Sequence, residues 1–360
     1  MTVKTDSPLI FVINPGSTST KVALYRGRKP VFEDELQHDY DTVAAFPTMV
    51  SQAPFRRDAA VACLESRGLS VADVDIFVGR GGLLRPVPSG AFKINRRMLA
   101  DVQAATFGEH ASNLGAPIAW ELSGQGKKPA FIANPVVVDE LCDEARITGL
   151  PELMRECPFH ALSHKAIGEK AAAKLGKPYE KCNLIVGHFG GGITIGAHRK
   201  GQVIDVNNGL FGEGPFTPQR GGGLTNLAFM KYCETKGLSL SEATKLLTRE
   251  AGFTAHLGTD DMVKIEKDVE AGRKKTTLVF DAFIYQVAKW MGAMAAALDG
   301  KVDAIAVTGG MVRGKLFMQK LRRKVRFIAP VMVFKKNSEM EALAVAALDV
   351  AEGKKKAKVY

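Results

Sequence analysis

The feature that most constrains the fold of this chain is a glycine turn between two apolar stretches, in the segment 184–197, LIVGHFGGGITIGA. β-Forming residues on both sides of Gly190–Gly192 predict a hairpin. The bare N–H groups of such a turn can reach an anion without obstruction by side chains. An earlier segment, 9–24 (LIFVINPGSTSTKVAL), has the same order of strand, glycine-containing turn and strand. This repetition indicates two related halves, each with a hairpin suited to phosphate.

Length and cysteine usage set the general class. A chain of 360 residues is too long for one compact core, so we expect two domains. The five cysteines have no C-x-x-C spacing, which is typical of a reduced protein without disulfides or a structural zinc site. The start of the sequence has no signal-peptide layout. Together these features predict a cytoplasmic protein.

The net charge of +11 is spread along the chain, apart from a lysine-rich tail. Neither a basic helix nor a basic strand with interleaved aromatic residues is evident, so we do not expect nucleic-acid binding. An anionic small molecule such as ATP suits a positive surface equally well. The longest apolar segment, 277–298, contains Asp281, Gln286 and Lys289. We therefore expect a buried helix there and no membrane span.

The first hairpin carries groups that suit a phosphate and the water ligands of Mg²⁺. After the strand at 10–13 come Asn14 and a glycine, then the four hydroxyl residues 17–20 and Lys21. The segment is not a Walker A loop, because G-x-x-x-x-G-K-[ST] is absent and a strand follows.

Two arginines stand in glycine-rich surroundings. Arg80 follows a predicted strand at 74–78, at the edge where parallel α/β sheets place ligands. Arg220 is the one arginine of the loop 212–223, GEGPFTPQRGGG. A loop of this composition contributes little to a core, so a functional role explains it better.

The sequence around the histidines favours structural roles over a metal site. A lone histidine such as His110 is more often structural than catalytic. His160 and His164 are four residues apart, but no carboxylate ligand or H-E-x-x-H pattern accompanies them, which argues against a transition-metal site. Ser163 is expected to be the N-cap of a helix at 165–175.

Seven segments together resemble the butyrate kinases of the acetokinase family, in the same order along the chain. They are INPGSTSTK (13–21), GRGG (79–82), GEHASN (108–113), PFHALSH (158–164), HFGGG (188–192), GEGPFTPQRGGG (212–223) and VTGG (307–310). This family is similar to the acetate kinases and belongs to the superfamily of sugar kinases, actin and chaperone ATPases.

The resemblance implies an α/β fold of two similar ribonuclease-H-like (actin-like ATPase) domains with a central nucleotide cleft. One domain would comprise 1–155 with a returning helix in 338–360, and the other 156–337. It implies that ATP and butanoate give ADP and butanoyl phosphate with Mg²⁺, in a homodimer or higher homo-oligomer. A carboxylate is ionised at neutral pH, so this chemistry needs positioning and charge neutralisation more than a strong base.

The resemblance also assigns roles to residues. Arg220 would stabilise the transferring phosphoryl group, Arg80 would lie near the carboxylate, His160 would donate to phosphoryl oxygens and His110 would line the acyl site. Asn14 and Glu341 would hold Mg²⁺ through water. The nucleotide would be bound by Asn14, Ser17, Ser19, Lys21, His188, Gly190, Gly191, Gly192, Asp261, Thr308, Gly309 and Gly310.

Several alternatives remain open at this point. The family's catalytic aspartate corresponds to Asn134 or to Asp139, and Glu341 either binds Mg²⁺ or completes a capping box with Ser338. Acetate, propionate or a branched acid are alternative acceptors, and the sequence does not give the physiological direction. A nucleotide-dependent assembly or chaperone ATPase on the same fold is the alternative of another class.

Overall fold

The computed structural model describes residues 7–336 and 339–360. The chain forms two compact units, Met1–Asp139 with Ser338–Tyr360, and Glu140–Asn337. Sequence analysis placed this division near residue 155. The difference arises because residues 140–155 pack within the second unit: Lys165 Nζ donates to Glu140, and Arg155 Nη1 donates to Asp205 Oδ1 at 3.0 Å.

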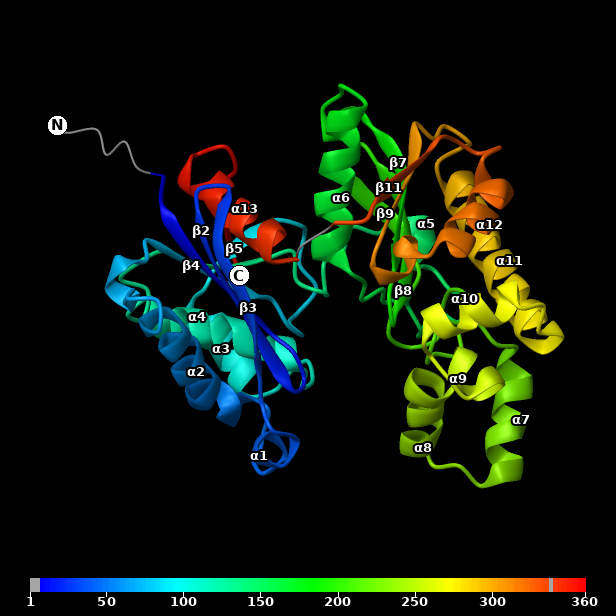
Figure 1. Cartoon of the computed structure of the whole chain (residues 1–360), viewed down its shortest axis with the longest axis horizontal. Coiled ribbons are helices and arrows are strands. Elements are labelled where there is room, and N and C mark those ends of the chain that lie inside the picture. The colour runs from blue at the N-terminus through cyan, green and yellow to red at the C-terminus, as the bar shows by residue number, and fades with distance from the viewer. Residues whose placement is uncertain (1–6, 337–338) are drawn as a thin grey trace. The chain divides into compact units, whose positions relative to one another are not determined.

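The first unit is built on a seven-stranded sheet (Figure 1). Across the sheet the strands are β12 (Lys358–Val359), β5 (Ala91–Lys93), β6 (Ala130–Ala133), β4 (Ile76–Arg80), β1 (Leu9–Pro15), β2 (Ser19–Arg26) and β3 (Lys29–Gln37). Its helices are α1 (Tyr40–Ala44), α2 (Ala53–Glu65), α3 (Arg96–Gln103), α4 (Gly115–Leu122) and α13 (Glu339–Ala351).

The second unit is built on a five-stranded sheet. Across it the strands are β11 (Val331–Phe334), β10 (Ala304–Thr308), β7 (Asn183–Phe189), β8 (Ile193–Arg199) and β9 (Gln202–Val206). Its helices are α5 (Asp143–Arg146), α6 (Ala161–Lys174), α7 (Asn226–Lys236), α8 (Leu240–Lys245), α9 (Gly252–Leu257), α10 (Met262–Glu270), α11 (Lys274–Ala297) and α12 (Lys315–Val325).

Both sheets share one strand order around a central hairpin. The first strand of each unit pairs antiparallel with the second, and the second pairs antiparallel with the third. On its other side the first strand pairs in parallel with the strand that follows a long connection, β4 in one unit and β10 in the other. This is the ribonuclease-H-like order, and the predicted fold class is confirmed.

Helices cover both faces of each sheet, which is why the middle of each central strand is a continuous apolar run, with polar residues only near the strand ends. In the second unit the side chains of β7 alternate. Leu184 and Val186 face the core with α6, whereas Ile185 faces the core with α11.

Helix α11 is the helix expected for the segment 277–298, but only one face of it is buried, since Leu278 and Tyr285 are exposed. Its polar residues are used within the unit, because Asp281 pairs with Lys320 of α12 at 2.5 Å and Gln286 Oε1 accepts from Phe216 N at 3.2 Å. Among the described residues no helix combines the length and apolarity that crossing a membrane requires.

Candidate active site

The two hairpin turns occupy equivalent places at the carboxyl ends of the two sheets. Ile13 of β1 lies beside Gly79 of β4, and Gly187 of β7 lies beside Val307 of β10. The next residue on each strand is therefore also equivalent, which matches Asn14 with His188 and Arg80 with Thr308. The residues predicted from separate motifs thus converge on one edge within each unit.

The first turn is hydrogen-bonded to Arg56 of α2. This side chain is fully buried, and sequence analysis missed it. Its Nη1 donates to the carbonyl oxygens of Gly16 and Ser19 at 2.7 and 2.8 Å, and its Nη2 donates to that of Ser17 at 2.8 Å. The guanidinium therefore satisfies the hydrogen-bonding capacity of three carbonyl groups of the turn. A buried cation on three main-chain oxygens also fixes the shape of the turn.

The side chains predicted to bind phosphate in this hairpin have a partner on the neighbouring strand. Ser19 Oγ donates to Glu35 Oε1 at 2.9 Å, and Lys21 Nζ lies 3.8 Å from Glu35 Oε2. Both partners of the Lys21–Glu35 pair are more than 40% exposed, so the pair is weak and can exchange for an anion. A nucleotide role for Ser17, Ser19 and Lys21 remains a prediction.

Replacing Arg56 with methionine should lower the free energy of unfolding by about 3 kcal/mol, because the turn carbonyls lose their buried donors. Urea unfolding followed by Trp120 fluorescence, in a Trp290→Phe background, reports on the first unit. Arg57→Met is the matched control, since Arg57 is 34% exposed and its surface ion pairs contribute about 0–1 kcal/mol. Equal losses in both variants would contradict the role of Arg56.

Asn14 and Arg80 meet on Glu339, at the start of α13. Asn14 Nδ2 donates to Glu339 Oε2 at 2.9 Å, and Arg80 Nη1 donates to the same oxygen. Sequence analysis had assigned Asn14 and Glu341 to Mg²⁺ through water. The two glutamates are about 200° apart around the helix, so they leave it in nearly opposite directions. Glu339 is thus the carboxylate beside Asn14, and a Mg²⁺ role for Glu341 remains a prediction. The alternative role of Glu341, in a capping box with Ser338, involves a residue outside the described part of the chain.

The GRGG and GEHASN segments pack against each other. A Cβ at Gly82 would collide with Asn113, whose Oδ1 accepts from Leu83 N at 2.7 Å. His110 is exposed, and its Nδ1 accepts from Ser112 N at 3.2 Å, so it caps the short helix that leads into α4. The structure gives His110 this local role, and its place in an acyl site remains a prediction.

The two candidates for the catalytic aspartate lie near the end of β6. Asn134 follows the strand directly and accepts from Gly90 N through Oδ1 at 2.7 Å. Asp139 lies five residues further on, and its main-chain N donates to Val87 O at 2.8 Å. Arg80 of β4 pairs with Ala133, the last residue of β6. Asn134 follows Ala133 directly, so of the two candidates it lies nearer in the chain to the residue that pairs with Arg80.

The second turn is supported by the glycine-rich loop that follows it in sequence. Gly190 N donates to Gly192 O at 3.1 Å, closing the turn. Thr217 Oγ1 donates to Gly191 O at 2.8 Å and accepts from Arg220 N at 3.1 Å. Gly309, with φ +101°, lies so close to the carbonyl of Phe189 that any Cβ would collide with it. The loop and the third glycine turn therefore both pack against this hairpin.

Arg220 lies with its guanidinium against Gly192. Its Nη1 donates to Gly209 O, and a methyl group at position 192 would lie 2.5 Å from that nitrogen. Burial lowers the pKa of Arg220, although a guanidinium remains charged at neutral pH. Among the described residues no carboxylate forms an ion pair with Arg220, whereas Arg155 pairs with both Asp205 and Glu213. A partly buried cation in this position is suited to a bound anion.

Two histidines stand beside the second turn. The rings of His160 and His188 are stacked, with centroids 4.0 Å apart and planes inclined by 11°. Ser163 Oγ lies 2.9 Å from His188 Nδ1. The expected N-cap role of Ser163 is wrong: α6 begins at Ala161 with His160 as N-cap, which places Ser163 inside the first turn and turns its hydroxyl toward His188.

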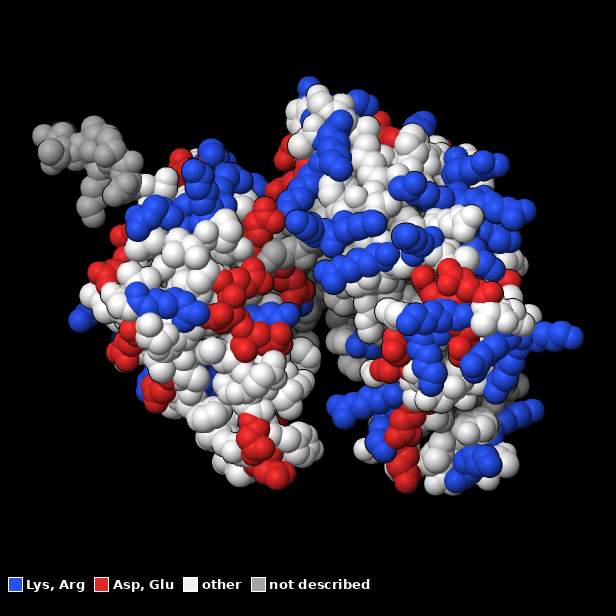
Figure 2. Space-filling view, viewed as in Figure 1, with Lys and Arg blue, Asp and Glu red and all other residues white. Residues whose placement is uncertain are grey.

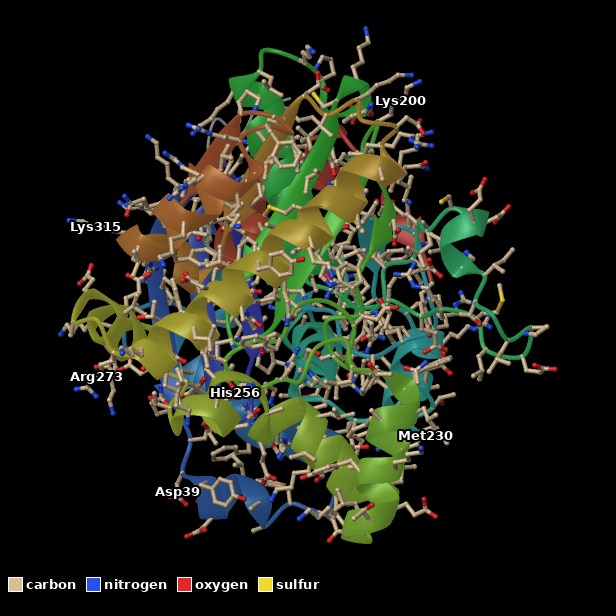
Figure 3. The ribbon with its side chains drawn as sticks, turned by 90° about the vertical axis from the view of Figure 1, so that its right-hand side faces the viewer. Asp39, Lys200, Met230, His256, Arg273 and Lys315 are labelled. Carbon is tan, nitrogen blue, oxygen red and sulfur yellow. The ribbon has the colours of Figure 1, made fainter. Side chains whose placement is uncertain are left out.

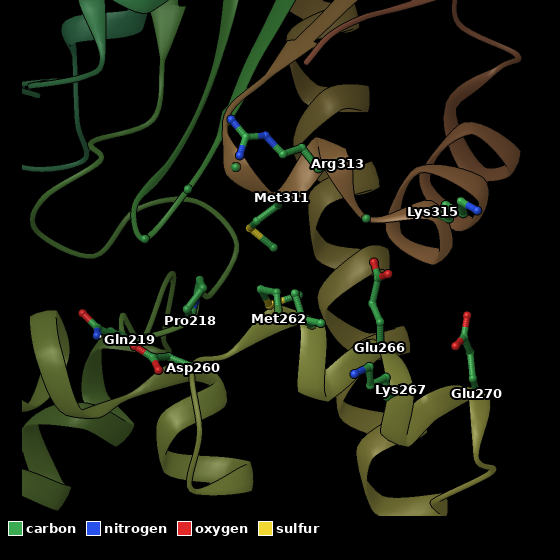
Figure 4. Close-up of a pocket in the computed structure, with 15 residues that line it drawn as sticks. Pro218, Gln219, Asp260, Met262, Glu266, Lys267, Glu270, Met311, Arg313 and Lys315 are labelled. Atoms are coloured by element: carbon green, nitrogen blue, oxygen red, sulfur yellow. Dashed lines mark hydrogen bonds between the residues drawn. The ribbon is translucent and has the colours of Figure 1, made fainter. Parts of the chain in front are cut away.

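A pocket of about 700 Å³ lies next to the second turn, within the range of ligand-binding cavities (Figure 4). Gly190, Gly191 and Gly310, three of the residues expected to bind the nucleotide, line it, and their role in binding remains a prediction. Its other lining residues come from the loop, from α10 and from the start of α12: Pro218, Gln219, Asp260, Met262, Val263, Glu266, Lys267, Glu270, Met311, Arg313, Gly314 and Lys315. Sequence analysis had singled out the loop 212–223, which supplies Pro218 and Gln219. It missed the other residues, because the sequence of α10 is that of an ordinary amphipathic helix.

Two residues predicted to bind nucleotide have other contacts. Asp261 Oδ1 accepts from Val263 N at 2.9 Å and caps α10, while its neighbour Asp260 lines the pocket and accepts from Gln219 Nε2 at 2.6 Å. Thr308 is fully buried, and its hydroxyl donates to Phe334 O at 3.0 Å. A direct role for Asp261 or Thr308 in binding the nucleotide remains a prediction.

The residues present fit Mg²⁺ held mainly by phosphate and water. Among the described residues no group of three or more histidines, cysteines or carboxylates could enclose a metal ion. Mg²⁺ in kinases is usually held by one or two protein oxygens and the substrate phosphates, so such a cage is not required. Asn14, with Glu339 at 2.9 Å from its amide, supplies one set of oxygens of this kind.

A family model described as the acetokinase family matches residues 150–347. The crystal structure of Porphyromonas gingivalis acetate kinase has a TM-score of 0.76 at 20% identity, covering 96% of this chain and 100% of that chain. A propionate kinase from Francisella tularensis subsp. tularensis SCHU S4 gives 0.74 at 19%, covering 95% and 99%. Acetate kinase from Entamoeba histolytica gives 0.75 at 14%, covering 96% and 98%. At these identities the similarity shows a common fold.

Proposed function

Since the chain belongs to the acetokinase family of carboxylate kinases, we propose that it transfers the terminal phosphoryl group of ATP to butanoate, giving ADP and butanoyl phosphate. The observation that carries the proposal is Arg220. Its guanidinium is partly buried against the second glycine turn, without a carboxylate partner among the described residues. A phosphoryl group in transfer is the anion that this position suits.

Contacts within each unit support the proposed roles. ATP lies in the pocket beside α10, with its phosphates toward Gly190–Gly192, and Arg220 and His160 contact the transferring group. Mg²⁺, when bound, neutralises charge on the phosphates. Arg80 orients the carboxylate; it already pairs with Glu339, so the substrate has to share or displace that carboxylate. Acetate, propionate and branched acids are the competing acceptors.

A hydroxamate assay with ATP and Mg²⁺, run on acids from acetate to hexanoate, tests the function. Acyl hydroxamate should form with at least one acid. If no acid gives a product while the protein still hydrolyses ATP, the proposal fails and a nucleotide-dependent assembly or chaperone ATPase becomes the better description.

For the choice of acceptor, kcat/KM for butanoate should exceed that for acetate by at least roughly tenfold. Each methylene buried in an apolar pocket contributes about 1–3 kcal/mol, so two methylenes give clear but incomplete discrimination. Competition between the two acids at equal concentration measures the ratio directly. Equal or reversed values would assign acetate as the acceptor and leave the carboxylate kinase activity intact.

A basic groove of about 740 Å³ adjoins the pocket and shares Arg313, Gly314 and Lys315 with it. Its cationic lining residues are Arg313, Lys315, Arg322, Arg323, Arg326 and Lys335. None of the six forms an ion pair with a described carboxylate. Figure 2 shows lysine and arginine gathered over this part of the second unit, and Figure 3 shows Lys315 pointing outward from α12. Such a field attracts anionic substrates.

Replacing Arg322 and Arg326 with serine should lower kcat/KM for ATP about threefold at low ionic strength, with kcat unchanged, because steering acts on association. The difference should vanish near 1 M salt, where charges are screened within about 3 Å. Lys231→Ser with Arg249→Ser, on α7 and after α8, removes the same charge elsewhere in the unit. The same loss in this control would mean that net charge, and not the groove, attracts ATP.

A further inference from the structure

A chain of hydrogen bonds runs from His160 into the core of the second unit. His160 Nδ1 lies 2.9 Å from Thr194 Oγ1, and the same hydroxyl lies 2.9 Å from Nε2 of His164. His164 Nδ1 lies 3.2 Å from His198 Nε2, and His198 Nδ1 lies 2.6 Å from Tyr179 Oη. The helix α6, the strand β8 and the short helix at 179–181 each supply part of the chain.

The interior of this chain is shielded from solvent. Thr194, His164 and His198 are each 0% exposed, and Tyr179 is 8% exposed. Burial lowers the pKa of His164 to about 3 and the pKa of His198 well below its usual value. Burial also raises the pKa of Tyr179 well above its usual value. Both rings are therefore neutral, and the tyrosine keeps its hydroxyl hydrogen.

Neutral rings and single hydroxyls allow only two arrangements of the hydrogens. A neutral imidazole has one N–H donor and one bare acceptor nitrogen, and each hydroxyl has one hydrogen to donate. Among the described residues the hydrogen-bond partners of the Thr194 hydroxyl are these two rings, so its hydrogen finds an acceptor only if Thr194 donates to one ring and accepts from the other. Every link then points in the same direction. Either Tyr179 begins the series as a donor and His160 Nδ1 ends it as an acceptor, or each hydrogen points the opposite way.

Tyr179 decides between the two. Among the described residues the only acceptor within hydrogen-bonding distance of its Oη is His198 Nδ1. In the reverse arrangement His198 would donate to the tyrosine, and the phenolic hydrogen would be buried without an acceptor. A buried donor that lacks an acceptor destabilises the folded protein. The arrangement in which Tyr179 donates is therefore favoured.

We infer that Tyr179 donates to His198, His198 to His164, His164 to Thr194, and Thr194 to His160, so that His160 carries its proton on Nε2. Thr194, His164, His198 and Tyr179 are then positioning residues for His160. The inference rests on the proposed function in one respect, since it gives His160 a neutral N–H donor to offer to the phosphoryl oxygens. Nδ1, accepting from Thr194, fixes the orientation of the ring.

Long-range ¹H–¹⁵N spectra of protein labelled in histidine test this directly. The chain has seven histidines, so the spectrum is simple, and His160→Gln assigns the key signals. We expect His160, His164 and His198 each to be protonated on Nε2 and bare on Nδ1. Protonation of the three rings on Nδ1 would overturn the inference, whatever the activity.

Thr194→Val tests the last link while keeping a β-branched side chain of the same shape. The Nδ1 signal of His160 should lose the shift caused by its hydrogen bond, and kcat should fall roughly tenfold with KM for ATP little changed. Thr194→Ser restores a hydroxyl and should recover most of kcat, which a purely structural role of Thr194 would not predict. If the spectra agree with the inference but Thr194→Val keeps its kcat, the proposed role of His160 fails, while the hydrogen-bond direction stands.

Discussion

Replacing Arg220 with alanine should lower kcat by on the order of 10³-fold, the scale of an arginine that stabilises a phosphoryl group in transfer. Its planar fork can contact two oxygens of that group, and the contact strengthens as charge develops in the transition state. The loss should therefore appear in kcat far more than in the affinity for ATP. Initial rates across ATP and butanoate concentrations separate the two.

Two further variants distinguish charge from geometry. Arg220→Lys returns the positive charge without the fork, so it should recover only a small part of the rate. Guanidinium ion added to Arg220→Ala should restore some activity, because it supplies the group that the variant lacks beside Gly192. Arg249→Ala, an exposed arginine of the same unit, is the control and should retain the full rate.

A structural role for Arg220 predicts a different pattern. Its Nη1 bond to Gly209 O and the contact of its main-chain N with Thr217 hold the loop. If this were its whole role, the melting temperature and the ATP affinity would fall together. A folded Arg220→Ala protein with near-normal kcat would exclude the catalytic role.

Local sequence patterns were enough to predict the hairpins and the glycine turns. Continuous runs of β-formers on both sides of Gly190–Gly192 determine a hairpin within a few residues, and the repeat at 9–24 predicted the shared topology of the two sheets. The requirement for glycine in VTGG likewise has a local cause, since Gly309 lies against the chain at Phe189. Short-range rules suffice where the structure is itself short-range.

The missed residues depend on contacts between distant segments. Arg56 reaches the first turn across 37 to 40 positions of sequence, and as a helical arginine it resembles its partly exposed neighbour Arg57. The choice between Glu339 and Glu341 depends on the rotation of α13 about its axis. Only the packing of this helix on the sheet shows that Glu339 faces Asn14. Ser163 was expected to be a cap because serine favours that position, but helix α6 starts two residues before it.

A tertiary contact likewise distinguishes Gly192 from its neighbour, and this allows a further test of the role of Arg220. Gly191 and Gly192 are adjacent in one turn, yet their surroundings differ. A methyl group at Gly191 would meet no described atom within 4 Å, whereas one at Gly192 would lie 2.5 Å from Arg220 Nη1 and 3.1 Å from its Cζ. The group that must move is the end of a flexible side chain, so the fold should tolerate both substitutions.

Gly192→Ala should therefore lower kcat by about 10²-fold, the cost of displacing a catalytic group by roughly 1 Å, while the melting temperature stays near that of the wild type. Gly191→Ala adds the same methyl group to the same turn and should affect kcat much less. In the Arg220→Ala background the guanidinium is absent, so Gly192→Ala should cause little further loss; this non-additivity is the signature of one shared contact. Additive losses would show that Gly192 serves the turn itself, and that the position of Arg220 does not depend on it.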